Sequence, residues 1–197
     1  DLKVGAIVWA TGWKPYDANK LETYGFGQHP DVITNVMMER LASWTGPTQG
    51  KILCPSDGRA PETVAFVQCA GSRDENHLPY CSAVCCRVSL KQALYVREKY
   101  PEASVYIIYK DMRSPSQFEK FYANVQQEDG IFFTKGEIAN VSKDNGHINV
   151  DVTDTLLGED IQVEADMLVL ATGMVPTTKV EGSLGYLDKP VEGNPGN

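Results

Sequence analysis

The segment "ETVAFVQCAGSRDENHLPYCSAVCCRVSLKQALYVREK", residues 62–99, decides the fold predicted for this chain of 197 residues. It begins with an apolar run that a glycine closes, which is typical of a buried strand. From Cys81 to Lys99 the pattern predicts a long helix, ended by Pro101 two residues later. A strand followed by a helix predicts one unit of an open α/β sheet.

Strand and helix patterns alternate on both sides of that segment. Ser116 and Glu119 predict a capping box at the start of another helix, and Asn145-Gly146 predicts a β-hairpin. Residues 31–46 read as a short helix with a glycine stop. Strands are expected at residues 4–10, 104–109, 130–141, 147–152 and 161–171. The predicted fold class is α/β, a Rossmann-like three-layer domain with a β-meander.

Composition restricts the function. A hydrophobic content of 42% is enough to bury a core, and no apolar run reaches the roughly 18 residues of a membrane helix. The net charge of -8 opposes nonspecific binding to nucleic acid. Residues 179–197 are rich in glycine and proline without periodicity, so we expect a flexible tail there.

The cysteines are the most informative residues. Cys54 stands alone and reads as a buried small hydrophobe. Cys69 ends the predicted strand, where Rossmann folds present ligand-binding groups. Cys81 and Cys85 are four apart and share a helical face, with Cys86 about 100° further round. These last four, in the pattern C-x(11)-C-x(3)-C-C, could surround one centre at a positive helix N-terminus.

Three kinds of chemistry remain open for these four thiols. Four thiolates suit an iron-sulfur cluster or zinc, although zinc sites usually use two C-x(2-4)-C knuckles and the adjacent Cys85-Cys86 pair departs from that spacing. Inert buried thiols and redox disulfides are the alternatives, and reduced thiols are the norm without secretion. The spacing of these four cysteines favours ligation of a metal ion or a cluster.

Several quoted motifs together resemble a known family. They are "PDVITNVMMERL", "GPTQGKIL", "VAFVQCAGSRD", "YCSAVCC", "LKQAL", "VYIIYKDMR", "FEKFY" and "ADMLVLATGMVP". Over residues 1 to 178 the chain resembles the A subunit of heterodisulfide reductase. It looks especially like the flavoprotein subunits of the quinone-interacting membrane-bound oxidoreductase of sulfate reducers.

The resemblance implies a flavoprotein built like thioredoxin reductase, in which a pyridine-nucleotide-type domain interrupts the FAD domain. "VGAIVWATGWKP", residues 4–15, and "ADMLVLATGMVP", residues 165–176, would then be the two hinge segments. Residues 1–60 are expected to hold a hinge strand of the FAD domain with a connecting helix and loop. Residues 61–178 would form the inserted domain.

The resemblance also implies a [4Fe-4S] cluster on Cys69, Cys81, Cys85 and Cys86. We expect that cluster to replace dinucleotide binding, because Cys69 stands in the pyrophosphate approach where a nucleotide reductase has glycine. NAD(P) and FAD are therefore not expected on this segment, and FAD belongs to the full-length protein. Candidate cofactor-contacting residues are Gly71, Ser72 and Arg73 in the turn, and Asp111 and Arg113 at the ribose position.

Three functions follow as hypotheses. The first is an electron-transfer module of an anaerobic oxidoreductase that passes electrons between FAD and partner iron-sulfur subunits. The others are an NAD(P)H-binding reductase domain, which lacks its glycine fingerprint here, and a zinc-stapled structural module. The resemblance implies a cytoplasmic location, held at the inner face of the membrane through membrane-associated partner subunits. A homodimer is left open.

Overall fold

The structure, a computed structural model, describes residues 3–6, 8, 10–144 and 146–177. It divides into two units, one built from Asp1–Pro15 with Met174–Asn197 and one from Tyr16–Gly173. The predicted tail at 179–197 lies outside the described residues.

In the first unit the two similar segments pair with each other. β1 (Trp13–Pro15) and β9 (Met174–Pro176) run antiparallel, with Trp13 opposite Pro176. The buried strand predicted at 4–10 is wrong for the described residues of that run, where Val4 is 60% and Val8 is 89% exposed. Among the described residues β9 is three residues long and pairs only with Trp13–Pro15, so the described part of the apolar run before it has no strand partner there.

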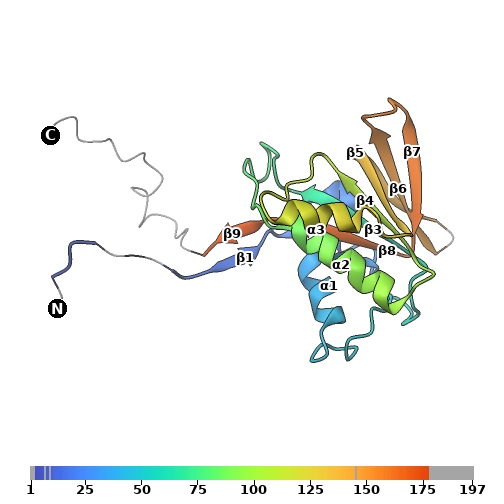
Figure 1. Cartoon of the computed structure of the whole chain (residues 1–197), viewed down its shortest axis with the longest axis horizontal. Helices are drawn as coiled ribbons and strands as arrows, with labels where there is room; N and C mark the ends of the chain where they lie inside the picture. Colours follow the sequence, from blue (N-terminus) through green and yellow to red (C-terminus); the bar gives the residue numbers. More distant parts are fainter. Residues whose placement is uncertain (1–2, 7, 9, 145, 178–197) are drawn as a thin grey trace. The chain divides into compact units, whose positions relative to one another are not determined.

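The second unit is built on one seven-stranded sheet (Figure 1). Its order is β2-β8-β3-β4-β5-β6-β7. The first five of these are parallel, and β5, β6 and β7 form an antiparallel meander. The strands are β2 (Val32–Thr34), β3 (Thr63–Ala70), β4 (Ser104–Tyr109), β5 (Ile131–Asp144), β6 (His147–Asp154), β7 (Asp160–Ala165) and β8 (Met167–Thr172).

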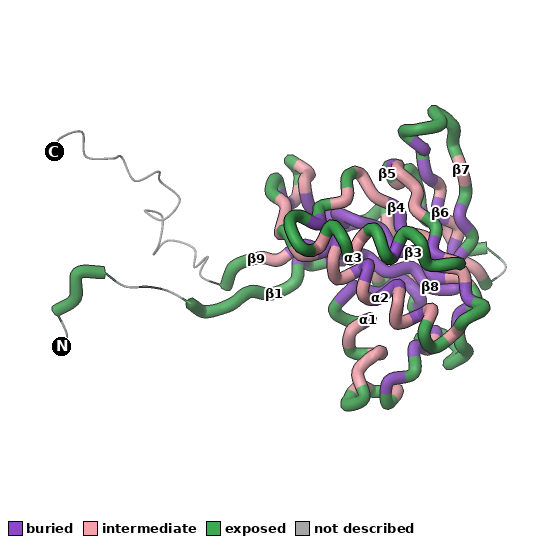
Figure 2. The backbone as a smooth tube through the Cα atoms, in the orientation of Figure 1, coloured by how far each residue is buried: buried purple, intermediate pink, exposed green. Residues whose placement is uncertain are grey.

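Helices cover one face of the parallel strands and the meander covers the other. α2 (Cys85–Lys99) packs on β3, β4 and β8, flanked by α1 (Asn35–Ala42) and α3 (Phe118–Val125) (Figure 1). The meander curls back so that β7 contacts β3 and β6 contacts β8. Every residue from Val64 to Ala70 is therefore buried (Figure 2). The predicted Rossmann-like three-layer fold is confirmed.

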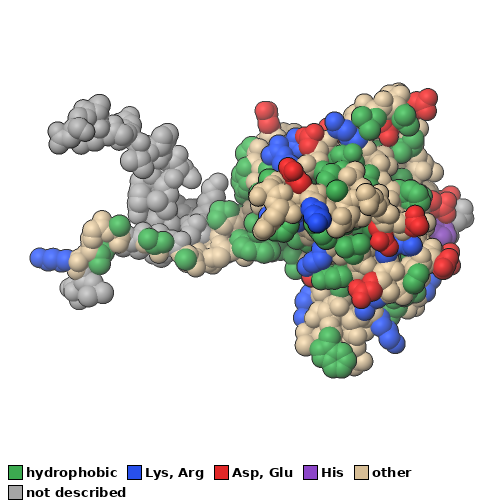
Figure 3. Space-filling view, in the orientation of Figure 1, with side chains coloured by type: hydrophobic (Ala, Val, Ile, Leu, Met, Phe, Trp, Pro, Cys, Tyr) green, Lys and Arg blue, Asp and Glu red, His purple; other side chains and the backbone are tan. Residues whose placement is uncertain are grey.

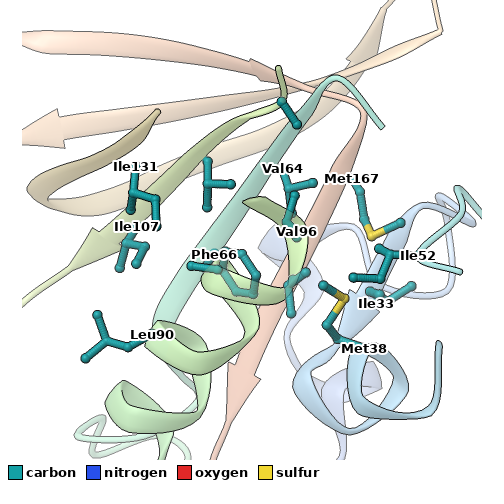
Figure 4. Packing of buried hydrophobic residues seen from close by; sticks show 14 of the residues in the cluster. Ile33, Met38, Ile52, Val64, Phe66, Leu90, Val96, Ile107, Ile131 and Met167 are labelled. Atoms are coloured by element: carbon teal, nitrogen blue, oxygen red, sulfur yellow. The ribbon is translucent and has the colours of Figure 1, made fainter. Parts of the chain in front are cut away.

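Successive side chains of β3 point to opposite faces of the sheet. Val64 and Phe66 belong to the cluster beneath the helices, and Figure 4 shows Phe66 among Leu90, Val96 and Ile107. A fully apolar strand is the expected sequence of a strand covered on both faces. The last residues of "TVAFVQCA" therefore lie at the carboxyl edge of the sheet, where open α/β sheets bind their ligands.

Three predicted element boundaries are corrected by the structure. The long helix begins at Cys85 and not at Cys81, because Ala83 has a left-handed φ of 57° that interrupts helical geometry. The segment 31–46 starts with β2 before α1. The strand predicted at 161–171 is two strands, which separate at Asp166 as the chain passes from the meander to the central sheet.

The predicted capping box is also wrong. Ser116 has a left-handed φ of 61°, and α3 starts after the N-cap Gln117 without a side-chain cap. The hairpin is confirmed, since Asp144 pairs with His147 across the turn. Across the described ranges, the helices lack the length and apolarity that would let one cross a membrane. Acidic and basic side chains are interspersed on the face of the Tyr16–Gly173 unit that Figure 3 presents.

Candidate functional site

Cys69 lies one residue before the carboxyl end of β3, as predicted. β3 is flanked by β8 and β4 in the parallel sheet, so Cys69 sits at the centre of the sheet's carboxyl edge. Its backbone φ of 57° is left-handed, which is strained for a residue with a side chain. The strain bends the strand end and shifts its register with β8 between Val67 and Ala70.

The eleven residues between Cys69 and Cys81 form a loop that folds back on itself. The Leu78 amide donates to the Gly71 carbonyl at 3.0 Å, and the Arg73 amide donates to the Tyr80 carbonyl at 3.2 Å. These two hydrogen bonds join the two arms of the loop, so the chain comes back to the carboxyl edge of the sheet. A spacing that looks long in sequence therefore brings Cys81 back beside Cys69.

Cys85 and Cys86 open α2 against the same edge. The Cys85 thiol donates to the Thr172 carbonyl at 3.5 Å, and the Cys86 thiol donates to the Asp111 carbonyl at 3.9 Å. Thr172 ends β8 and Asp111 follows β4, so the two thiols lie toward the strands on either side of Cys69. Those two flanking strands are roughly 10 Å apart.

The splayed thiols explain why no preformed metal site is found. Among the described residues, no group of three or more His, Cys, Asp or Glu side chains is arranged to hold a metal ion. Thiol-to-carbonyl hydrogen bonds are weak, because the S–H group is a poor donor.

The thiols influence one another electrostatically. Burial, and to a smaller extent the neighbouring Cys86, Cys69 and Cys81, raise the pKa of Cys85 to about 12. Burial likewise raises the pKa of Cys86 and of Cys69. Burial thus outweighs the helix N-terminus that we expected to favour thiolates. The four cysteines are close enough to repel as anions, so a bound cation is what would allow them to ionise together.

Four cysteine sulfurs fit an iron-sulfur cluster or zinc in kind. The sulfurs come from one strand end, one loop and one helix start. Gly173, directly after Thr172, is tightly packed, because a Cβ there would collide with the hydroxyl oxygens of Ser72 and Ser82.

Cys54 lies apart, as predicted. Its thiol donates to the carbonyl of Asp166, which precedes β8, whereas Cys85 contacts the opposite end of the same strand. Burial raises the pKa of Cys54 to about 12.

Of the other predicted site residues, Arg73 and Asp111 come together. The Arg73 Nη2 donates to the Asp111 Oδ2 at 2.7 Å, and this hydrogen bond holds the pKa of Asp111 below its usual value. Gly71 and Ser72 form the turn that links Cys69 to Arg73. Gly71 has a left-handed φ of 73° and lies against the Tyr16 ring. Arg113 is exposed at the same edge.

Sequence reasoning missed Gln68. It is 3% exposed, and within the described structure neither atom of its amide has a hydrogen-bond partner. The available signal was a single amide inside the apolar run, directly before Cys69. His77, the one histidine in the loop, hydrogen-bonds Tyr16 Oη through Nδ1 at 2.8 Å.

Two solved structures share this fold. The fold matches thioredoxin reductase from Giardia duodenalis with a TM-score of 0.50 at 16% identity, over 85% of this chain and 43% of that one. It matches L-lysine 6-monooxygenase from Pseudomonas syringae with a TM-score of 0.52 at 10% identity, over 85% and 45%. The second unit therefore has the fold found in thioredoxin-reductase-type flavoproteins.

No family model matches the chain. Relatives that are similar in sequence identify the family more narrowly than the shared fold does. The chain is 43% identical over 178 residues to the second iron-sulfur A subunit of CoB--CoM heterodisulfide reductase from Methanopyrus kandleri, covering 88% of this chain and 27% of that relative. It is 41% identical over 184 residues to the A subunit of a ferredoxin/F(420)H(2)-dependent CoB-CoM heterodisulfide reductase from Methanosarcina acetivorans, covering 92% and 23%.

The chain is therefore a homologue of the A subunit of heterodisulfide reductase, as its motifs predicted. It spans about a quarter of the length of these relatives.

Proposed function

We propose that this chain is the electron-transfer module of a multisubunit flavin and iron-sulfur oxidoreductase. In the proposal Cys69, Cys81, Cys85 and Cys86 hold a [4Fe-4S] cluster, which accepts and donates single electrons when bound. Electrons would pass between an FAD held by the rest of the polypeptide and iron-sulfur subunits of the same complex. The relatives are named as subunits of heterodisulfide reductases, which supports a multisubunit assembly.

One observation carries the proposal, namely the placement of the four cysteines at the carboxyl edge of the parallel sheet. Open α/β sheets bind their ligands at that edge. Dinucleotide-binding domains use a glycine turn there that leads directly into a helix. In this chain β3 ends at Ala70 and α2 begins only at Cys85, with the folded loop and the cysteines between them.

The chain's own residues would bind and shield the cluster. Cys69, Cys85 and Cys86 are each more than nine-tenths buried, which limits solvent access and lowers the local dielectric. Partner iron-sulfur and membrane-associated subunits would hold the assembly at the cytoplasmic face of the membrane, as the sequence resemblance implies.

Anaerobic purification and metal analysis test the proposal. We expect iron and acid-labile sulfide, with one [4Fe-4S] equivalent and its EPR signal lost in both Cys69→Ala and Cys86→Ala. The matched control is Cys54→Ala, which removes an equally buried thiol at the other end of β8 and should keep full iron content.

Zinc in place of iron, lost from the same variants, would show a structural zinc module instead. Loss of the cluster from Cys54→Ala with retention in Cys69→Ala would show that the ligand set is wrong.

A further inference from the structure

Arg73 occupies an unusual position beside the candidate ligands. It belongs to the loop after β3, while its partner Asp111 follows the neighbouring strand β4. The hydrogen bond from Nη2 to Asp111 spans the two strand ends at 2.7 Å, and Lys135 of β5 lies 4.0 Å from the same carboxylate. The carboxylate after β4 thus fixes one guanidinium at the cysteine edge.

The other end of that guanidinium has no acceptor. Arg73 Nη1 is buried and lacks a hydrogen-bond partner within the described residues, although the whole side chain is 23% exposed. Ser72 Oγ beside it is also buried and unpaired in this part of the chain. A buried donor without an acceptor costs free energy that folding alone does not recover. Such donors are expected where a ligand supplies the acceptor.

Cys69 is the thiol that Arg73 affects. Burial raises the pKa of Cys69, and the charge of Arg73, whose side chain lies within reach of the thiol, opposes that rise. Both residues have a left-handed φ of 57°, a strained conformation that persists only where the surrounding structure holds it. Asp111 fixes the guanidinium from the far side.

We propose that Arg73, aimed by Asp111, is a positioning residue that sets the reduction potential of the cluster. This inference rests on the proposed function. Nη1 would donate to the Cys69 sulfur or to an adjacent cluster sulfide. Reduction adds negative charge, and a donated hydrogen bond with a positive charge stabilises the reduced state more than the oxidised state. Arg73 therefore raises the reduction potential.

Lys110 provides a matched comparison at the same edge. Its charge also lowers the pKa of Cys69, but through space only. Its Nζ is directed to Glu137 at 3.2 Å. Lys110 thus contributes positive charge without a hydrogen bond to the thiol, and a lysine-to-glutamine change there isolates the effect of charge.

The experiment is an EPR-monitored redox titration of the anaerobically purified holoprotein and four variants. Arg73→Gln is expected to keep its iron and sulfide content while its midpoint potential shifts to more negative values. Arg73→Lys, which keeps the charge and loses the fork, should shift less. Asp111→Asn should shift in the same direction, because the guanidinium loses its anchor. Lys110→Gln should shift least.

An unchanged midpoint potential in Arg73→Gln overturns the inference, as does a shift in Lys110→Gln as large as that in Arg73→Gln. If Arg73→Gln fails to fold or loses its iron, Arg73→Lys and Asp111→Asn decide, and unchanged potentials in both overturn the inference. Absence of iron from the unmodified protein would refute the proposed function itself. A cluster that is present but insensitive to Arg73 refutes only the inference.

Discussion

The two ends of the parallel sheet differ in how their buried polar groups are paired. At the amino end, Asp166 accepts hydrogen bonds from Arg59 at 2.6 Å and from the amides of Glu62 and Thr63 at 2.7 and 2.9 Å. The equally buried Asp31 accepts from the amide of Ser56 at 2.9 Å and from Lys143 at 3.3 Å. Each buried carboxylate at this end has partners for its charge.

At the carboxyl end, buried polar atoms lack partners within the described residues. They are both amide atoms of Gln68, Ser72 Oγ, Arg73 Nη1 and Ser114 Oγ. Backbone strain gathers there too, with left-handed φ values at Cys69, Arg73 and Ala83. Strain and unsatisfied donors persist where the surrounding structure outweighs them, and they concentrate at functional sites. The amino end stabilises the fold, and the carboxyl end is available for chemistry.

The largest effect is expected from Asp166→Asn at the amino end. The change leaves Arg59 without its buried partner and weakens two amide hydrogen bonds, so the free energy of unfolding should fall by about 3 kcal/mol in urea titrations. Asp57→Asn is the control, because Asp57 also pairs with Arg59, at 3.0 Å, but is exposed. It should change stability by less than about 0.5 kcal/mol. Equal effects of the two variants would contradict the comparison.

Alkaline pH should destabilise the amino end through Cys54. Burial raises the pKa of this thiol to about 12, against about 8.5 in an unfolded chain. Stability is therefore complete below about pH 8.5 and is lost as the pH rises toward 12, by up to about 1.4 kcal/mol per pH unit. Urea titrations under reducing conditions at pH 8 and pH 10 measure this slope. Cys54→Ala should reduce it, and an unchanged slope would show that Cys54 does not cause it.

A substitution at the carboxyl end should have the opposite sign. Gln68→Met removes an amide that has no partner in the described structure, so the free energy of unfolding should stay unchanged or rise by about 1 kcal/mol. Gln92→Met is the control, because Nε2 of that buried glutamine donates to Asn35 O at 2.8 Å and to Glu39 at 3.0 Å, and only its Oε1 lacks a partner among the described residues. It should lose about 1 to 3 kcal/mol. A clear loss in Gln68→Met would mean that its amide supports the fold.

The smallest effect is expected for nicotinamide nucleotides. Cys69 and the long loop before α2 replace the glycine turn that a pyrophosphate needs, so NADH and NADPH should bind weakly or not at all. Calorimetric titration measures this, and Arg73→Gln should remove any residual affinity for phosphate. A dissociation constant in the low micromolar range would favour the NAD(P)H-binding alternative.

Local pattern was enough for much of this protein. The largely apolar run 63–70 predicted a strand covered on both faces, and Asn145-Gly146 predicted a hairpin, because period and turn chemistry act over a few residues. The prediction that four cysteines share one site came in the same way from their order along a β-loop-α unit, and it stays a prediction. Even the isolation of Cys54 could be read from its distance along the chain.

Only the tertiary structure decided the rest. Whether helix could begin at Cys81 depended on the left-handed turn at Ala83, and whether 4–10 formed a strand depended on a pairing partner elsewhere in the chain. The pairing of Arg73 with Asp111 and the unpaired amide of Gln68 join or isolate atoms that are far apart in sequence. Such contacts depend on which strands become neighbours, and a single sequence carries no local signal for that order.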